Sequence, residues 1–160
     1  MPSIIVLDKL SPDGLALLDA AGRLGISYEV KTGLSGEELK NVLASHDGAI
    51  CRSGVKITED VLAGNHRLRA IVRAGVGTDN IDKQAATRQG IVVMNTPAGN
   101  TVSTAEHAFT LLLALSRNVA PADASLREHR WDRGKYMGVQ LAGKTLGIVG
   151  MGRIGQAVAS

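Results

Sequence analysis

TLGIVGMGRIG, residues 145–155, is the stretch of sequence that decides the class of fold. Residues 145–149 predict a short buried strand, and residues 156–159 predict the start of a helix. Gly150, Gly152 and Gly155 stand between the two at the GxGxxG spacing. The first glycine permits a tight turn, the second lets backbone amides approach a pyrophosphate, and the third lets helix and strand pack closely. A GxGxxG turn between a strand and a helix predicts a dinucleotide-binding unit.

The same motif also calls for an acidic residue about 20 positions further on, which binds a ribose hydroxyl. The sequence ends at Ser160, five residues after the third glycine. A dinucleotide crevice needs several adjacent parallel strands, and this stretch supplies one. We therefore expect the nucleotide-binding unit to be truncated after the GxGxxG turn.

Composition is typical of a soluble globular chain, with 160 residues, 44% hydrophobic and 21% charged. The net charge of +3 comes from scattered Lys and Arg, and one Trp, two Tyr and one Phe are too few for stacking platforms. We therefore expect no nucleic-acid partner. The apolar run at residues 4–7 is too short for a signal peptide or a membrane span, which predicts a cytoplasmic protein with no membrane partner. Cys51 is the only cysteine, so no disulfide forms within the chain, and we expect a small buried side chain.

Short apolar runs alternate with amphipathic segments over the first 95 residues. Helix starts are predicted at Ser11, before Pro12, at Ser35 in a capping box with Glu38, and at the caps Thr58 and Asp82. The predicted strands are residues 4–7, 28–30, 48–51, 70–73 and 91–94. Strands separated by helices of this length imply right-handed crossovers, so we expect a doubly wound α/β domain with a five-stranded parallel sheet.

TPAGN, residues 96–100, breaks this alternation, because Pro97 disfavours a helix before it and Gly99 relaxes the backbone. We interpret it as a crossing between domains, with residues 1–97 in the first and 98–160 in the second. Residues 101–117 predict a long helix that is apolar over more than one face and therefore buried on several sides. A second helix over 119–128, a polar segment over 130–138 and a turn at 141–144 complete the prediction.

Four runs carry a resemblance to a known family: RAGVGTDNID at 73–82, GIVVMNTPAGN at 90–100, AEHA at 105–108 and LAGKTLGIVGMGRIG at 141–155. In this order and spacing they resemble the D-isomer-specific 2-hydroxyacid dehydrogenases. The resemblance implies a flavodoxin-like substrate domain, lacking its usual C-terminal return helix, and the truncated start of a Rossmann NAD-binding domain. It also implies NAD-dependent interconversion of a D-2-hydroxy acid and its 2-keto acid. RWDRGKYMG at 130–138 and the MNTPAGN form of the crossing are similar to the D-3-phosphoglycerate dehydrogenase branch, which acts in serine biosynthesis.

Two loops follow predicted strand ends, where α/β proteins bind ligands. The arginine of the first loop can hold a carboxylate or phosphate, or it can simply lie on the surface. The two glycines of the second loop can present backbone amides to an anion, or they can form only a tight turn. The resemblance places both loops against the substrate and brings Val76 near the nicotinamide as well. The loops are Arg52, Ser53, Gly54 and Val55, and Gly75, Val76 and Gly77.

The resemblance implies further contacts. Asn100 would contact substrate and cofactor in the cleft, although it can also cap the following helix. Arg133 would reach a substrate phosphate across a homodimer interface, while Trp131 beside it can equally be a packing anchor. The residues implied beside the cofactor pyrophosphate are Gly150, Gly152, Arg153, Ile154 and Gly155.

No catalytic residue is predicted within the chain. None of the four histidines has a carboxylate at a spacing that specifies an acid/base pair, and we expect no metal site. The family's catalytic Arg, Glu and His are expected beyond residue 160, so we expect this chain alone to be inactive and to bind NAD weakly or not at all. Alternatives are another D-2-hydroxyacid dehydrogenase, such as a glyoxylate/hydroxypyruvate reductase or a D-lactate or formate dehydrogenase, and a non-catalytic NAD-sensing or carboxylate-binding relative.

Overall fold

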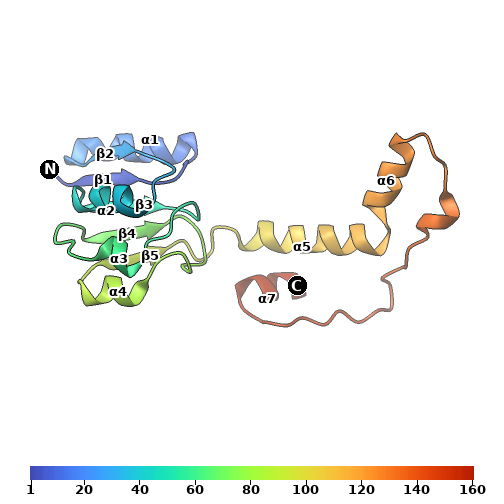
Figure 1. Cartoon of the computed structure of the whole chain (residues 1–160). Coiled ribbons are helices and arrows are strands. Elements are labelled where there is room, and N and C mark those ends of the chain that lie inside the picture. Colours follow the sequence, from blue (N-terminus) through green and yellow to red (C-terminus); the bar gives the residue numbers. More distant parts are fainter. The chain divides into compact units, whose positions relative to one another are not determined.

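A five-stranded sheet organises the first part of the chain in a computed structural model that describes residues 1–160. All strands are parallel and their order is β2-β1-β3-β4-β5 (Figure 1). This is the flavodoxin-like order, which confirms the predicted fold class. The strands are β1 (Ser3–Val6), β2 (Ser27–Val30), β3 (Gly48–Cys51), β4 (Ala70–Arg73) and β5 (Val92–Asn95).

Four helices connect these strands: α1 (Pro12–Ala21), with the short 3-10 turn η1 (Gly22–Leu24), α2 (Gly36–Ala44), α3 (Glu59–Leu62) and α4 (Lys83–Arg88). Two predicted caps form, because the Ser11 hydroxyl accepts from the Gly14 amide at 3.2 Å and the Asp82 carboxylate accepts from the Ala85 amide at 2.9 Å.

The capping box predicted for Ser35 and Glu38 is wrong. Ser35 occupies the N-cap position of α2, but its hydroxyl makes no capping bond. The chain enters the helix through Gly36 in the left-handed region, at a φ of 54°, instead of in helical geometry, so the hydroxyl is not presented to the first turn. Thr58 likewise precedes α3 without a side-chain bond.

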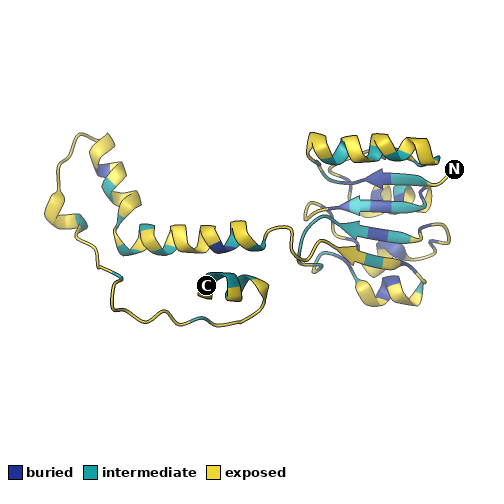
Figure 2. Ribbon diagram, turned by 180° about the vertical axis from the view of Figure 1, so that it is seen from behind, coloured by how far each residue is buried: buried dark blue, intermediate teal, exposed yellow.

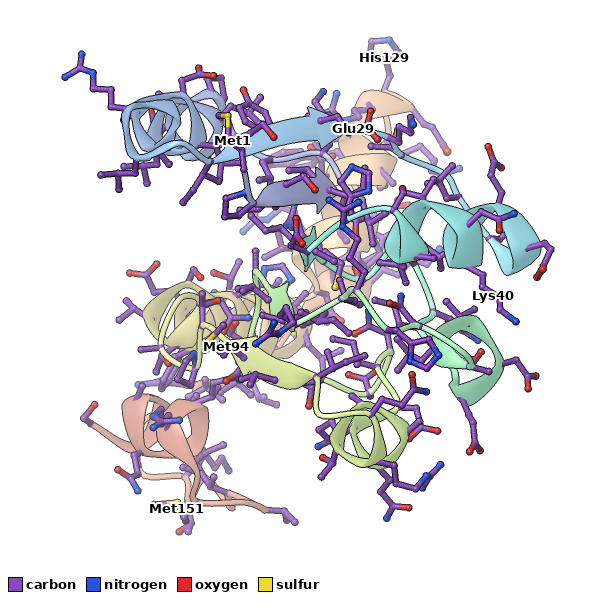
Figure 3. The ribbon with its side chains drawn as sticks, turned by 90° about the vertical axis from the view of Figure 1, so that its left-hand side faces the viewer. Met1, Glu29, Lys40, Met94, His129 and Met151 are labelled. Atoms are coloured by element: carbon purple, nitrogen blue, oxygen red, sulfur yellow. The ribbon has the colours of Figure 1, made fainter.

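The hydrophobic core lies between the sheet and α2, α3 and α4. Fully buried side chains from the strands and these helices form one cluster, which includes Ile5, Leu39, Leu43, Leu62 and Ile71. Figure 3 looks along the strands, with α2 and Lys40 on one side of the sheet and Met94 toward the other. On that second face Val92 and Met94 are 56% and 46% exposed, and α1 buries no residue completely.

The second compact unit spans Asn100–Ser160, and the first spans Met1–Gly99. It contains α5 (Thr101–Ser116), α6 (Val119–Arg127), the 3-10 turn η2 (Arg133–Tyr136) and α7 (Arg153–Ala159), with α5 packed against α6 and α7. Ala105 is the one buried residue of α5, so the predicted burial on several sides is wrong (Figure 2). Val102, Leu111, Leu113 and Leu115 are each more than half exposed, because α6 and α7 cover only part of the helix.

The buried strand predicted at residues 145–149 does not form. These residues form no strand and make no backbone hydrogen bond, and Val149 is fully exposed. A parallel strand is stabilised by neighbours that complete its hydrogen bonds, and the second unit contains no other strand. None of the helices in the chain combines the length and the apolarity required to cross a membrane.

Candidate functional site

The loops that follow β1, β3 and β4 meet at the carboxyl edge of the sheet, where parallel α/β folds bind their ligands. Backbone bonds join the ends of these strands: the Leu7 amide donates to the Ile50 carbonyl at 2.8 Å, and the Ala74 amide donates to the Cys51 carbonyl at 2.8 Å. Asp8, the loop at 52–55 and the loop at 75–77 therefore lie along one edge.

The loop after β3 is held by two side chains. The Asp8 carboxylate accepts from the Arg52 amide at 2.6 Å and from the Gly54 amide at 3.1 Å. From the other direction, the Asn80 amide group donates to the Arg52 carbonyl at 2.8 Å and to the Val55 carbonyl at 2.9 Å. Val55 also anchors the loop by burying its side chain. Neither the Ser53 amide nor the Arg52 guanidinium has an acceptor within the chain.

The loop after β4 also presents unpaired amides. The Gly75 amide donates to the Arg73 carbonyl at 2.8 Å, and the Gly75 carbonyl accepts from the Thr96 amide at 3.0 Å. The Asn95 side chain donates to the Val76 carbonyl at 2.7 Å, which fixes the orientation of that peptide. The amides of Val76 and Gly77 donate to nothing in the chain. Unpaired N–H groups in succession form a concave binding surface for an anion.

Arg73 adds positive charge to this edge. It is the last residue of β4, and its guanidinium lies so close to Gly75 that a Cβ on that glycine would collide with it. The Nε atom of Arg73 is buried and has no hydrogen-bond partner. An unpaired buried donor is destabilising, and a ligand that supplied an acceptor to this guanidinium would relieve that cost.

Cys51 lies at the same edge but is not a nucleophile. Its side chain is fully buried, and burial, with the nearby Asp8 carboxylate, raises the pKa of the thiol to about 11. The thiol therefore stays protonated at neutral pH. Cys51 acts as the small buried side chain that the sequence predicts.

The buried histidine belongs to a structural contact away from these loops. His46 follows α2, its Nδ1 lies 2.8 Å from the Val42 carbonyl oxygen, and its Nε2 lies 3.2 Å from the Glu29 carboxylate of β2. Lys31 donates to the same carboxylate and lowers the pKa of Glu29, which Figure 3 labels. The other three histidines, His66, His107 and His129, are exposed.

Two candidates lie in the second unit. Asn100 stands at the N-cap position of α5, but its side-chain oxygen accepts no hydrogen bond from the first turn, so the side chain does not cap the helix. Arg133 lies in η2 and lines a cleft of about 310 Å³ with Ser125, Trp131 and Tyr136. Trp131 is 73% exposed, so it is not a packing anchor within this unit.

The GxGxxG turn retains its local geometry although its strand does not form. Gly150 has a φ of 101°, which a residue with a side chain rarely adopts. Gly152 precedes α7 with open space around its Cα, and Arg153 and Ile154 form the first turn of that helix. A Cβ on Gly155 would collide with the Gly150 carbonyl oxygen, so only glycine lets the helix approach the turn this closely.

A family model matches residues 4–156, and its description is D-isomer specific 2-hydroxyacid dehydrogenase, catalytic domain. This chain belongs to that family. The match covers both units, so the 2-hydroxyacid dehydrogenase resemblance predicted from the sequence is confirmed.

Relatives within the 2-hydroxyacid dehydrogenase family are similar over the whole chain. D-3-phosphoglycerate dehydrogenase 2, chloroplastic, of Arabidopsis thaliana is 48% identical over 99% of this chain, and D-3-phosphoglycerate dehydrogenase of Archaeoglobus fulgidus is 45% identical over 98%. The chain spans 25% and 29% of the lengths of these two relatives. Among solved structures, NAD-dependent formate dehydrogenase from Staphylococcus aureus in complex with NAD superposes with a TM-score of 0.86 at 28% identity, covering 99% of this chain and 52% of that one.

Three residues at the carboxyl edge were missed by sequence reasoning: Asp8, Arg73 and Asn80. Arg73 and Asn80 stand inside RAGVGTDNID, a run used only to identify the dehydrogenase family. Asp8 follows the first apolar run directly, and a polar residue at that point of a parallel sheet lies at the ligand-binding edge. That position was the available signal for Asp8.

Proposed function

We propose that this chain is the N-terminal part of an NAD-dependent D-2-hydroxyacid dehydrogenase whose substrate is D-3-phosphoglycerate, oxidised to 3-phosphohydroxypyruvate. Residues 1–97 form its substrate domain and residues 98–160 begin its NAD-binding domain. The observation that carries the proposal is the carboxyl edge, with its unpaired amides at Ser53, Val76 and Gly77. The D-3-phosphoglycerate dehydrogenases that are 42–48% identical to this chain support the choice of substrate.

The substrate carboxylate binds the unpaired amides of Val76 and Gly77, and Arg52 and Arg73 neutralise its charge. Paired guanidinium–carboxylate hydrogen bonds are about twice as strong as neutral ones, which suits a small acidic ligand. Ser53 and the backbone of Gly54 and Val55 form the adjoining wall. Hydrogen bonds that fix the carboxylate also fix C2, which is bonded to it and bears the hydroxyl group.

NAD, when bound, accepts the hydride from C2 of the hydroxy acid. The turn at Gly150, Gly152 and Gly155 fits its pyrophosphate, because a Cβ on Gly152 would meet nothing within 4 Å and the first amides of α7 have no acceptor in the chain. Arg153 and Ile154 contact the pyrophosphate, and Val76 and Asn100 contact the nicotinamide end. The strand before the turn is unpaired, so we assign this chain only these contacts and weak NAD affinity.

The substrate phosphate is assigned to Arg133 of a second copy in a homodimer. Arg133 makes no ion pair within the chain, and the apolar side chains exposed on α5 provide surface for a second copy to bury. Light scattering tests the dimer, and a strictly monomeric mass at high concentration contradicts it. A cytoplasmic location remains a prediction, since two relatives are named as chloroplastic.

Calorimetric titration with 3-phosphoglycerate tests the proposal. We expect binding by the wild-type chain and a loss of about tenfold or more in affinity on Arg52→Ala or Arg73→Ala, since a hydrogen bond to a charged group contributes roughly 1.5–3 kcal/mol. Arg23→Ala, an exposed arginine in η1, is the matched control and should leave affinity unchanged. D-lactate, glyoxylate and formate distinguish the other family activities.

The proposal fails if 3-phosphoglycerate does not bind, or if it binds equally well to both arginine variants. Tighter binding of one of the three unphosphorylated acids would move the assignment to that branch of the family.

A further inference from the structure

We propose that Asp8 and Asn80 are positioning residues of the substrate site, which hold the loop at 52–55 so that its free amide and its arginine face the ligand. This inference rests on the proposed function, because the loop has to bind substrate for its position to matter. Neither side chain is assigned a contact with the substrate. They act through the backbone of the loop.

Asp8 holds the loop through its amides. Both carboxylate oxygens are used, one by the Arg52 amide at 2.6 Å and the other by the Gly54 amide at 3.1 Å. The intervening Ser53 amide is left without an acceptor. Gly54 is what admits the carboxylate, because a Cβ at that position would collide with the Oδ1 atom of Asp8. Asp8 thus accepts from the Arg52 and Gly54 amides and leaves the Ser53 amide free to bind a ligand.

Asn80 holds the same loop through its carbonyls. Its side-chain NH₂ group donates to the Arg52 and Val55 carbonyls at 2.8 and 2.9 Å, and its backbone carbonyl accepts from the Ile57 amide at 2.9 Å. Asn80 belongs to the segment that follows Gly77, so it ties the two anion-binding loops together. A shift of one loop would therefore move the other.

The charge of Asp8 makes the proposal testable by sign. A carboxylate close to an anion-binding loop repels an anionic ligand, so removal of its charge strengthens binding if electrostatics alone decides. Removal of a positioning residue weakens binding, because the Ser53 amide and the Arg52 side chain lose their fixed direction. Asp8→Asn distinguishes the two, since an asparagine has one oxygen for two amide donors and turns its NH₂ group toward the other.

The experiment measures 3-phosphoglycerate affinity by calorimetry on Asp8→Asn and on Asp60→Asn, with hydrogen exchange of the Arg52 and Gly54 amides followed by NMR. Asp60 is an exposed acid of α3 whose side chain makes no hydrogen bond, so Asp60→Asn removes one negative charge, as Asp8→Asn does, without removing a hydrogen bond to the loop. We expect Asp8→Asn to lower the affinity for 3-phosphoglycerate by about tenfold or more. Asp60→Asn should leave the affinity unchanged or raise it by up to about threefold. Faster exchange of both amides should accompany the loss in Asp8→Asn, at a temperature where the variant is fully folded.

A second pair of variants guards against a general loss of structure. Asn80→Ala should weaken binding as Asp8→Asn does, while Asn41→Ala, on the exposed surface of α2, should not. Unchanged or tighter binding by Asp8→Asn overturns the positioning role, as does unchanged exchange of its Arg52 and Gly54 amides. Failure of the wild-type chain to bind, with both amides still protected, overturns the proposed function and the positioning role with it, while leaving the hydrogen bonds in place.

Discussion

Replacement of Gly54 by alanine should destabilise the first unit, although the backbone of Gly54 is not in the left-handed region. The new Cβ would collide with the Oδ1 atom of Asp8 and lie 3.2 Å from its Cγ, so the carboxylate has to move away from the loop. Both of its bonds to the Arg52 and Gly54 amides are then lost. The perturbation is therefore local and has a defined cause.

The expected magnitude follows from those two bonds. Each hydrogen bond to an ionised acceptor contributes roughly 1.5–3 kcal/mol, and the lower value applies here because water can reach the loop. Alanine recovers about 0.4–1 kcal/mol by restricting the unfolded chain. We expect the free energy of unfolding to fall by about 2 kcal/mol.

Urea unfolding followed by the NMR amide peaks of Ile5 and Ile50 reports on the first unit alone. Gly22→Ala is the matched control, because Gly22 has helical dihedral angles and a Cβ there would meet nothing within 4 Å. It should stabilise the unit by about 0.4–1 kcal/mol, opposite in sign to Gly54→Ala. Equal effects of the two substitutions, or a neutral Gly54→Ala, would refute the assignment of Gly54 to the close approach of Asp8.

Three further predictions concern pH, packing and thiol chemistry. The Arg67 guanidinium and hydrogen bonds from the Ser3 amide and hydroxyl hold the pKa of Asp47 well below its usual range. The ionised Asp47 carboxylate therefore stabilises the fold fully above the unfolded pKa of about 4, and this stabilisation is lost as the pH falls further. Asp47→Asn should therefore lower the free energy of unfolding at pH 7 and differ less from wild type at pH 2; a difference independent of pH would contradict this. Leu43→Ala, in the core, should cost about 2–5 kcal/mol in urea unfolding, whereas Leu17→Ala at a 74% exposed position should change stability by less than about 0.5 kcal/mol, and similar losses would exclude the assigned core. Cys51, with its pKa of about 11, should resist a thiol reagent at pH 8 until the chain unfolds, and rapid labelling of the folded chain would show that the thiol is accessible.

The strands of the first unit could be predicted from sequence because each one is a short apolar run between turn residues. Residues 48–51 and 70–73 match β3 and β4 at both ends, and the remaining strands differ by at most one residue at either end. The parallel direction of the strands followed from the crossover rules, since a helix between two strands returns the chain to the same end of the sheet. These properties depend on local sequence and general geometry.

The strand predicted at 145–149 failed for a reason that local sequence does not contain. Its apolar pattern is that of a buried strand, but strand formation depends on a paired neighbour, which the second unit does not provide. The long helix predicted over 101–117 did form as α5, but its predicted burial failed for the same reason, since an apolar surface is buried only where another element covers it. Strand pairing and helix burial both depend on the elements that surround a segment, which its own sequence does not specify.

The candidate site was predictable as far as motifs reach. The two loops at 52–55 and 75–77 lie at one edge of the sheet, as strand-end reasoning predicts, while the role of each residue in binding stays a prediction. Asp8 was missed because its partners lie 44 and 46 positions away, and no spacing in the sequence links them. Asn80 was missed because its side chain donates to backbone carbonyls, and every residue has a backbone carbonyl, so the sequence does not mark these partners.

The unpaired segment at residues 145–149 also makes the chain vulnerable to proteolysis. A protease binds its substrate as an extended strand, and this segment has no regular secondary structure, no backbone hydrogen bonds and four exposed residues of five. Lys144 stands directly before it and is exposed, so trypsin should cleave there well before it digests the sheet. Such a cut would release α7 from α5 as a separate peptide, and mass spectrometry of a brief digest would detect it.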